Sequence, residues 1–368
     1  MRIDAIDKNL VVETDVTEPD LVWFNIEDAP FEIHGVKFEE CEGFYTRMPR
    51  EAAERVSTGV LGSRKFTTGG RVRFRTDSKF IAIKAVMRNM EPFSHMPLTA
   101  QSGFDLYRKV EGYEGGREMY YKSFIPPQGI TEGYSSGKAT DGKYCDYTIN
   151  FPLVDRVQAL YIGLKKDAHL SAPTPYTYQT PIVFYGNSAT QGAVASRPGN
   201  TFPAMIARML DADIINLGFA GKCKGEFPMA EYIATLPMTA FVLDYDHNTP
   251  SEQNLIDTHW PFYKKVREAH PDIPIIFMTA SNVGLLGNVN YAGRGFLFTR
   301  REIIRENYNR AVAEGDKNIY FVDGECLLEG EMWDTCTVDG AHPSDLGFFR
   351  IAQVIGGVLK EMLGIKEK

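Results

Sequence analysis

The spacing of apolar residues changes near residue 180, and this change limits the fold more than any other feature of the sequence. Before it, short runs such as residues 71–75, 80–86 and 157–163 alternate apolar and polar side chains, which is the period of a half-buried strand. Several such runs separated by turn residues predict an antiparallel β-sandwich of the jelly-roll kind. A Pro-rich stretch at 171–181 follows, and it is typical of a semi-rigid linker.

After residue 180, apolar runs with the length of strands alternate with segments of helical spacing. We expect strands at 181–185, 213–217, 239–245, 273–279 and 318–323, and helices near 201–210, 258–269, 300–314 and 346–362. This α/β alternation predicts a parallel, doubly wound sheet of the flavodoxin-like kind. A chain of 368 residues is too long for one ordinary core, so we predict two domains, at residues 1–175 and 178–368.

The composition argues against several kinds of partner. The formal net charge is −8, with 40 Lys and Arg against 48 Asp and Glu, which disfavours nucleic acid and anionic membrane surfaces. No apolar run is long enough to cross a bilayer, and residues 1–8 lack the apolar core of a signal peptide, so we expect a cytoplasmic location. Five cysteines, odd in number and without a CxxC pair, are typical of reduced thiols.

A Ser, an Asp and a His, the residue types that carry out acyl transfer, can meet at the carboxyl end of the expected parallel sheet, where such sheets bind ligands. Ser188 follows the expected strand at 181–185 in a glycine-rich turn, so its hydroxyl can project above the carboxyl end of the sheet. Asp339 and His342 lie close together in sequence and can reach the same place. A nucleophile, a base and a carboxylate are the parts of a Ser-His-Asp mechanism, so we predict these three residues as catalytic. The alternative is structural: a turn Ser, a His at a helix start and a capping Asp.

The wider pattern resembles the SGNH, or GDSL-like, esterase superfamily over roughly residues 180–368. Its four sequence blocks are similar to 186–192 (GNSATQG), 216–221 (NLGFAG), 244–248 (DYDHN) and 339–342 (DGAH). The third block departs from the usual Gly-x-Asn-Asp string. The resemblance implies an SGNH domain whose oxyanion donors are the backbone N–H of Ser188, the N–H of Gly218 and the side-chain amide of Asn248.

The N-terminal half carries a second, less specific resemblance. Residues 102–107 (SGFDLY) are similar to the Gly-x-Asp-Leu-Tyr segment of β-sandwich modules fused to some of these hydrolases, and 197–199 (RPG) recurs in that subgroup. In such enzymes the sandwich packs against the catalytic domain. We therefore expect the sandwich to border the Ser188 crevice, with residues 90–99 as a candidate wall; the alternative is that these residues form an ordinary surface loop.

The resemblance implies a serine esterase that removes a small acyl group, such as acetyl, from a carbohydrate. Its partner would be a small-molecule or oligosaccharide ester, and a homo-oligomer remains open. The sequence shows no His/Cys cluster with the spacing of a zinc site, so neither a metal nor an organic cofactor is expected. Two alternatives stay open: an acyltransferase that uses the same acyl-enzyme, and a carbohydrate-binding protein that keeps the scaffold without activity.

Several further residues lie near the blocks. His247, beside Asn248, is a candidate for substrate contact, although an ordinary loop position is the alternative. Gly221 and Asn187 are expected to be structural. Cys223 lacks any context for Cys catalysis and is expected to be a buried or near-site thiol.

Overall fold

The computed structural model describes residues 16–88, 93–109, 112, 117–129, 132–281 and 296–365. These residues form two compact units. The first holds the described residues up to 46, together with 65–175 and 196–199, and the second holds 47–64, 176–195 and the described residues from 200 onward. Within the described ranges, none of the helices combines the length and apolar character needed to cross a membrane.

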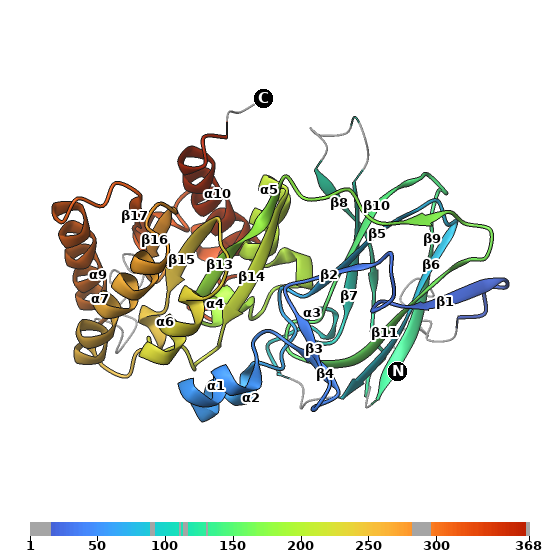
Figure 1. The fold of residues 1–368 in the computed structure, drawn as a ribbon, viewed down its shortest axis with the longest axis horizontal. Helices are drawn as coiled ribbons and strands as arrows, with labels where there is room; N and C mark the ends of the chain where they lie inside the picture. Colours follow the sequence, from blue (N-terminus) through green and yellow to red (C-terminus); the bar gives the residue numbers. More distant parts are fainter. Residues whose placement is uncertain are drawn as a thin grey trace. The chain divides into compact units, whose positions relative to one another are not determined.

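The described residues of the first unit form two larger antiparallel sheets and one two-stranded sheet, drawn in blue to green in Figure 1. Its elements are β1 (Leu21–Asn25), β2 (Glu32–His34), β3 (Lys37–Glu39), β4 (Phe44–Thr46), β5 (Arg71–Thr76), β6 (Phe80–Arg88), α3 (Leu98–Gln101), β7 (Phe104–Lys109), β8 (Glu118–Phe124), β9 (Gly133–Ala139), β10 (Cys145–Asn150), β11 (Arg156–Lys165) and β12 (Leu170–Ser171). One sheet has the order β1-β11-β6-β9; the other has the order β12-β5-β10-β7-β8, with β2 beside β5. Strands β3 and β4 pair with each other.

Alternate residues of these strands fill the space between the sheets. Val72 and Phe74 of β5, Ile81 and Ile83 of β6 and Ile162 of β11 are fully buried members of one core cluster. The period-2 apolar pattern therefore folds as expected, because it gives each sheet one apolar face to bury. The predicted antiparallel β-sandwich is confirmed.

A buried carboxylate fastens the short segment 196–199 to this unit. Asp105 on β7 is fully buried, and its Oδ2 accepts hydrogen bonds from the Gly199 N–H at 2.8 Å and from Arg197 Nη1 at 3.1 Å. Its Oδ1 accepts from Asn150 Nδ2 at 2.8 Å. The Arg197 guanidinium also lies 4.0 Å from the centre of the Tyr120 ring. The DLY and RPG sequence motifs therefore meet in one hydrogen-bonded cluster.

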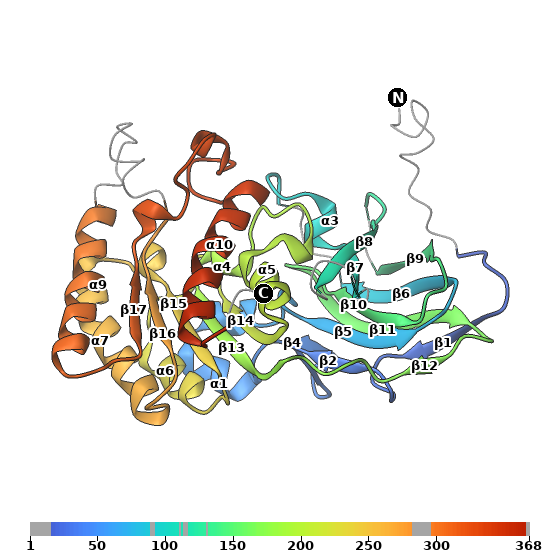
Figure 2. The same ribbon diagram turned by 90° about the horizontal axis from the view of Figure 1, so that it is seen from above.

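The second unit is a five-stranded parallel sheet covered by helices on both faces (Figure 2). Its elements are α1 (Arg50–Val56), α2 (Thr58–Ser63), β13 (Tyr178–Gly186), α4 (Ser188–Gln191), α5 (Phe202–Leu210), β14 (Ala212–Gly218), α6 (Phe227–Ala234), β15 (Ala240–Asp244), α7 (Glu252–Ala269), β16 (Ile275–Met278), α9 (Phe296–Ala313), β17 (Ile319–Val322) and α10 (Asp345–Met362). Its short helical turns are η5 (Asp246–Asn248), η6 (Gly324–Cys326) and η7 (Trp333–Thr335); a further turn, η4 (Pro198–Asn200), belongs mostly to the first unit.

The strand order β14-β13-β15-β16-β17 is the flavodoxin-like order, so the predicted doubly wound sheet is confirmed. Helices α5 and α10 pack on each other, and α6, α7 and α9 form a second group. Thr201, Ser251 and Ser344 begin α5, α7 and α10, because each side chain accepts a backbone N–H of the first turn. Helix α6 was not predicted, since its eight residues are too few to show a clear helical period.

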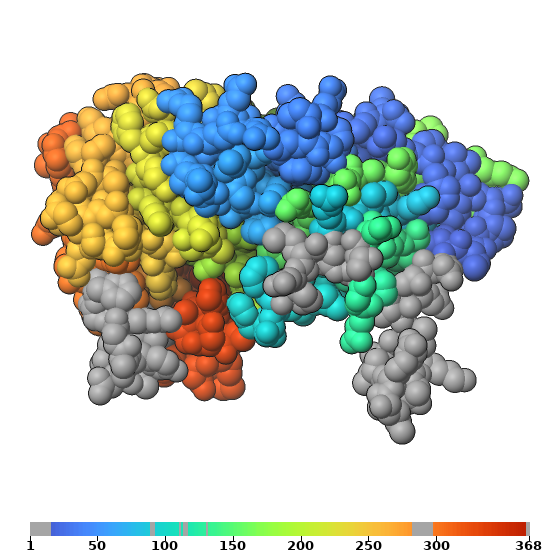
Figure 3. Space-filling model, turned by 90° about the horizontal axis from the view of Figure 1, so that it is seen from below, coloured from blue at the N-terminus to red at the C-terminus, as the bar shows by residue number. Residues whose placement is uncertain are grey.

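Two segments depart from the predicted domain boundary. Residues 47–64 belong to the second unit, where Ala53 and Val60 of α1 and α2 join the core cluster beneath the sheet. Figure 3 shows this segment in blue beside the yellow surface that includes α6. Residues 196–199 belong to the first unit. The chain therefore passes between the two units at 46/47, 64/65, 175/176, 195/196 and 199/200.

Asp105→Ala should lower the free energy of unfolding by about 3 kcal/mol, because it removes the buried acceptor of a cation and leaves the Gly199 N–H without its carboxylate. Urea unfolding followed by circular dichroism measures this. Asp141→Ala, which removes an exposed ion pair with Arg108, should change the same free energy by less than about 1 kcal/mol. Equal effects of the two substitutions would contradict the role assigned to Asp105.

Candidate active site

The nucleophile candidate stands on a tight turn at the carboxyl end of the central strand. β13 ends at Gly186, and α4 begins at Ser188. Asn187 joins them: its Oδ1 accepts from the Ala189 N–H at 2.7 Å, and its own N–H donates to the Asp244 carbonyl at 3.0 Å. A Cβ at Gly186 would lie 2.5 Å from that carbonyl oxygen, so only glycine fits there. Asn187 has the structural role that was predicted.

The base and its carboxylate share a short loop. His342 Nδ1 lies 2.7 Å from Asp339 Oδ2, and the backbone N–H groups of His342 and Ala341 donate to Asp339 Oδ1 at 2.8 and 3.0 Å. Gly340 between them has φ of +81°, a conformation that favours glycine. Partial burial alone would raise the pKa of Asp339, but the hydrogen bonds from His342 and Ala341 lower it to about 2. Asp339 is therefore ionised and can orient the imidazole.

Two other carboxyl groups near the turns are buried and serve the structure. Asp244 accepts hydrogen bonds from Asn187 Nδ2 at 3.0 Å and from Thr190 Oγ1 at 2.7 Å. Burial, together with the charge of Asp246, raises the pKa of Asp244 well above 3.8. Burial also raises the pKa of Asp246 to about 6, although the Ala280 N–H donates to it at 2.9 Å. Neither acid matches the low pKa that suits the carboxylate partner of a catalytic His.

A cavity of about 260 Å³ brings together four of the predicted residues, Ser188, His247, Asn248 and His342. Its lining consists of Asn187, Ser188, Ala189, Asp244, His247, Asn248, Met278, Ser281, Ala341 and His342. These residues come from the carboxyl ends of β13, β15 and β16 and from the loop before α10. The place agrees with the rule for ligands of open parallel sheets.

Some lining residues were not predicted, and some predictions remain untested. Met278 lies near the end of the expected strand at 273–279 and Ser281 just after it, so the strand-end rule itself could have found them. His247 lines the cavity, and its contact with substrate stays a prediction. The border role of residues 90–99 also stays a prediction, and residues 90–92 of that segment lie outside the described residues.

The side chain of Asn248 has a defined orientation. Its Oδ1 accepts hydrogen bonds from the Gly221 N–H at 3.0 Å and from Cys223 Sγ at 3.0 Å. An amide whose oxygen accepts two bonds presents its NH2 group to other partners. Cys223 is fully buried, and burial raises the pKa of its thiol well above 9, so it remains a protonated donor. Asn248 can therefore donate to an oxyanion in the cavity.

The backbone N–H of Gly218, a predicted oxyanion donor, has another partner in the structure. Its N–H donates to Asn216 Oδ1 at 2.8 Å, and Gly218 is not part of the cavity lining. A Cβ at this position would lie 2.2 Å from the backbone nitrogen of Gln191, so the glycine serves close packing against α4. Gly221, predicted to be purely structural, is the glycine of this block whose N–H binds the Asn248 side chain.

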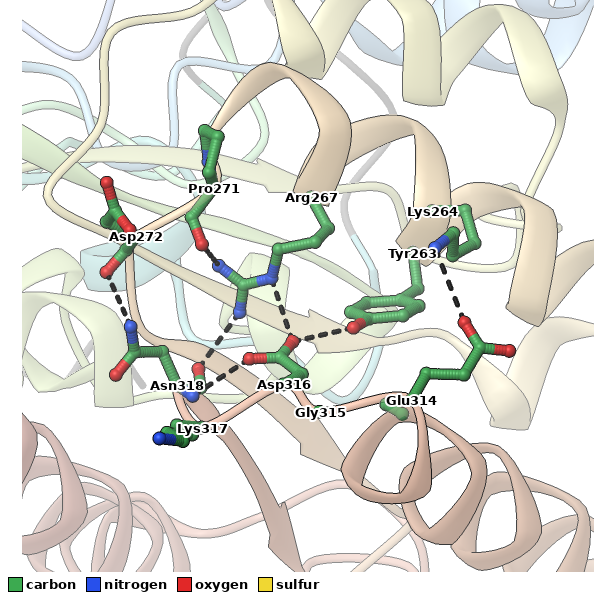
Figure 4. A pocket seen from close by; sticks show the side chains of 11 residues that line it. Tyr263, Lys264, Arg267, Pro271, Asp272, Glu314, Gly315, Asp316, Lys317 and Asn318 are labelled. Carbon is green, nitrogen blue, oxygen red and sulfur yellow. Dashed lines mark hydrogen bonds and ion pairs between the residues drawn. The ribbon is translucent and has the colours of Figure 1, made fainter.

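A second cavity, of about 380 Å³, lies near the amino ends of β16 and β17 (Figure 4). Arg267 Nε and the Tyr263 hydroxyl both donate to Asp316 Oδ2, at 2.8 and 2.6 Å. The remaining Arg267 N–H groups donate to backbone carbonyls of the neighbouring loops. This cluster ties α7 to the loop before β17, at the end of the sheet opposite to the one where ligands bind. We interpret it as structural.

The described side chains can be compared with the arrangement that a metal ion requires. Among the residues that the structure describes, no group of three or more His, Cys, Asp or Glu side chains is arranged to hold a metal ion. The groups that meet in the cavity are instead a hydroxyl, an imidazole and an amide. These groups can carry out nucleophilic acyl transfer by themselves.

The fold and the residues that meet in the cavity are those of an acylhydrolase family. Residues 179–360 match the GDSL-like lipase/acylhydrolase family, and residues 21–170 match the GxDLY family, described as the N-terminus of SGNH-hydrolase-type esterases. The chain is a GDSL-like acylhydrolase with a GxDLY N-terminal module, as its sequence blocks indicated. A comparison with curated protein sequences finds no match.

Solved structures share both parts of the fold. A Bacteroides ovatus protein described as a GDSL-like lipase is 28% identical with a TM-score of 0.82, and the match covers 95% of this chain and 99% of that one. A salicylyl-acyltransferase from a tetracycline biosynthetic pathway is 19% identical with a TM-score of 0.76, covering 95% and 99%. An acetyl xylan esterase from the rumen bacterium Butyrivibrio proteoclasticus is 14% identical with a TM-score of 0.60, covering 94% and 100%.

Asp339→Asn should lower kcat for an ester substrate at pH 8 by roughly 10²–10⁴-fold, because the neutral amide cannot stabilise the imidazolium. Stopped or continuous ester assays measure this, and Asp334→Asn in the exposed turn η7 is the control.

The pKa of Asp339 in the folded chain, about 2, lies below its ordinary 3.8. The stabilising effect of this carboxylate is therefore present above about pH 4 and disappears as the pH falls towards 2. A difference in the free energy of unfolding between wild type and Asp339→Asn that grows as the pH falls would contradict this.

Proposed function

We propose that this chain is a serine esterase that removes a small acyl group, acetyl in the first instance, from a carbohydrate. The observation that carries the proposal is the cavity of about 260 Å³ in which Ser188, Asn248 and His342 meet. A hydroxyl, an imidazole held by an ionised carboxylate and an oriented amide are the groups that hydrolysis of an ester requires.

In the first half of the reaction, the Ser188 Oγ attacks the carbonyl carbon of the ester. Because His342 Nδ1–H is donated to Asp339, Nε2 is the ring nitrogen that takes the Ser188 proton. The negative charge that develops on the carbonyl oxygen is stabilised by the Asn248 NH2 group and the Ser188 backbone N–H. His342 then gives the proton to the leaving alkoxide, so the alcohol departs and the acyl group stays on Ser188.

In the second half, a water molecule attacks the acyl-enzyme while His342 Nε2 accepts its proton. The same donors stabilise the second tetrahedral intermediate. When that intermediate collapses, the proton passes to Ser188 Oγ and the carboxylic acid is released. The two halves use one base and one set of donors, so no further catalytic group is needed.

Three lines support a small acyl group and a sugar as the alcohol. The cavity is small for an enzyme pocket, and the small residues Ala189, Ser281 and Ala341 line it beside the longer apolar side chain of Met278. The acidic chain suits a neutral substrate better than a polyanion. The fold is shared with an acetyl xylan esterase and with a family two carbohydrate esterase from Clostridium thermocellum that was solved with cellohexaose.

Wild-type protein should release acetate from p-nitrophenyl acetate and from acetylated xylo-oligosaccharides, and Ser188→Ala should lower kcat by about 10³-fold or more. Ser123→Ala on the exposed face of β8 is the matched control and should keep full activity. A fluorophosphonate probe should label wild type, but neither Ser188→Ala nor His342→Ala. Unlabelled wild type without turnover would exclude an esterase and leave a binding protein that keeps the scaffold.

An acyltransferase is the second candidate, and a specific observation favours it. The TM-score to the salicylyl-acyltransferase, 0.76, exceeds the 0.60 to the acetyl xylan esterase. The acyl-enzyme on Ser188 would be the same, with a hydroxyl acceptor in place of water. Incubation with an acyl donor and sugar alcohols, followed by mass spectrometry, separates the two: acylated sugar supports transfer, whereas free acid alone supports hydrolysis.

A further inference from the structure

A buried arginine from the N-terminal half of the chain supports the strand end next to the nucleophile. The Arg47 side chain is 4% exposed. Its Nη1 donates to the carbonyl oxygens of Gly218 at 2.6 Å and Asn216 at 3.0 Å, and its Nη2 donates to the carbonyl of Ser63 at 3.0 Å. The guanidinium also lies 4.5 Å from the centre of the Phe219 ring. One side chain therefore binds three carbonyl groups, two of them at the end of β14.

The peptide group between Gly218 and Phe219 is held at both ends. Arg47 binds its carbonyl oxygen, and its N–H donates to the carbonyl of Gly186 at 2.8 Å. Gly186 is the last residue of β13 and precedes the turn that carries Ser188. Rotation of this peptide group would break both hydrogen bonds at once, so Arg47 fixes a contact that reaches the nucleophile turn.

The same loop also reaches the amide donor of the cavity. The Ala220 N–H donates to Gln191 Oε1 at 2.9 Å, and the Gly221 N–H donates to Asn248 Oδ1 at 3.0 Å. Only one peptide group, between Phe219 and Ala220, separates the peptide whose carbonyl Arg47 holds from the peptide whose N–H holds Asn248. A shift of the Gly218 carbonyl would therefore be passed directly to the orientation of the Asn248 side chain.

We infer that Arg47 is a positioning residue for both Ser188 and Asn248, and that residues 47–64 are part of the catalytic unit. The inference rests on the proposed esterase function. Residues 47–64 lie outside the 179–360 match to the acylhydrolase family and inside the 21–170 match to the GxDLY module. The module thus supplies a support of the active site as well as a β-sandwich.

The chemistry of the site requires arginine. The carbonyl oxygens of three separate residues need several N–H donors in a fixed planar arrangement, which guanidinium provides and ammonium does not. Burial lowers the pKa of Arg47 to about 9, which still leaves the side chain charged at neutral pH. Removing the donors would leave buried carbonyl oxygens without their partner and free the loop to move.

The test compares Arg47→Met and Arg47→Lys with Arg55→Met, an exposed residue of the same segment that pairs with Glu231. Active sites are counted by end-point labelling with the fluorophosphonate probe, and kcat and KM are measured on p-nitrophenyl acetate. For Arg47→Met we expect kcat per labelled site to fall by about tenfold to a hundredfold, because misplaced catalytic groups cost this much. KM should change by less than about twofold, because substrate binding is not affected. Arg47→Lys should recover part of the loss, and Arg55→Met should equal wild type.

Each outcome is decisive once folding has been checked by circular dichroism and Tm. Folded Arg47→Met with wild-type kcat per labelled site would overturn the inference. If Arg47→Met does not fold, a lowered kcat in folded Arg47→Lys supports the inference, whereas a wild-type kcat, or failure of both variants to fold, overturns it. Turnover that Ser188→Ala retains would instead overturn the proposed function, and this inference with it.

Discussion

The register of β13 with its two neighbours determines where the candidate active site lies in this chain. Gly186, the last residue of β13, pairs with Gly218 of β14 on one side and with Asp244 of β15 on the other. The three strands therefore end at the same level, and the turns that follow them deliver Ser188 and Asn248 to one place. A slip of one residue would reverse the direction of every side chain in a strand and separate these groups.

Close packing at this edge depends on small residues and on short polar side chains. Glycines at the ends of β13 and β14 let the first turn of α4 rest directly on the strand ends, where a Cβ would meet backbone atoms. Asn216 then donates from its Nδ2 to the carbonyl of Thr190 at 2.7 Å and accepts the Gly218 N–H. Polar groups that the strands leave unpaired thus form hydrogen bonds with the neighbouring turn, which helps to hold Ser188 in position.

The sequence predicted the parts of this site that depend on local patterns. Strand ends are visible as apolar runs, and Ser188 and His342 stand in segments whose residue types are specific enough to recognise. The orientation of Asn248 was not predictable, because it is set by the N–H of Gly221 and the thiol of Cys223, which the sequence alone does not place beside it. Likewise, the spacing of two glycines in one loop does not tell which backbone N–H is already bonded.

The role of residues 47–64 could not be predicted from the sequence, for a different reason. Their two helices are short, and an apolar residue such as Ala53 or Val60 does not reveal which of two cores it will join. Arg47 in a sequence looks like any other surface cation, since most arginines remain exposed. Its partners, the carbonyls of Asn216 and Gly218, lie far along the chain and belong to the backbone, so no residue type signals the contact.

The repeated passage of the chain between its two units has a consequence for how the protein folds. Arg47 and the Gly218 carbonyl are 171 residues apart in sequence, and Asp105 and the Gly199 N–H are 94 apart. During synthesis, segment 47–64 cannot pack until the sheet that it covers has been made. The β-sandwich likewise lacks residues 196–199 until they have been made. The first unit is complete in sequence at residue 199, whereas the second unit needs both the early segment 47–64 and the chain from residue 200 onward. Contacts that close such long loops must overcome a larger loss of chain entropy, which slows folding.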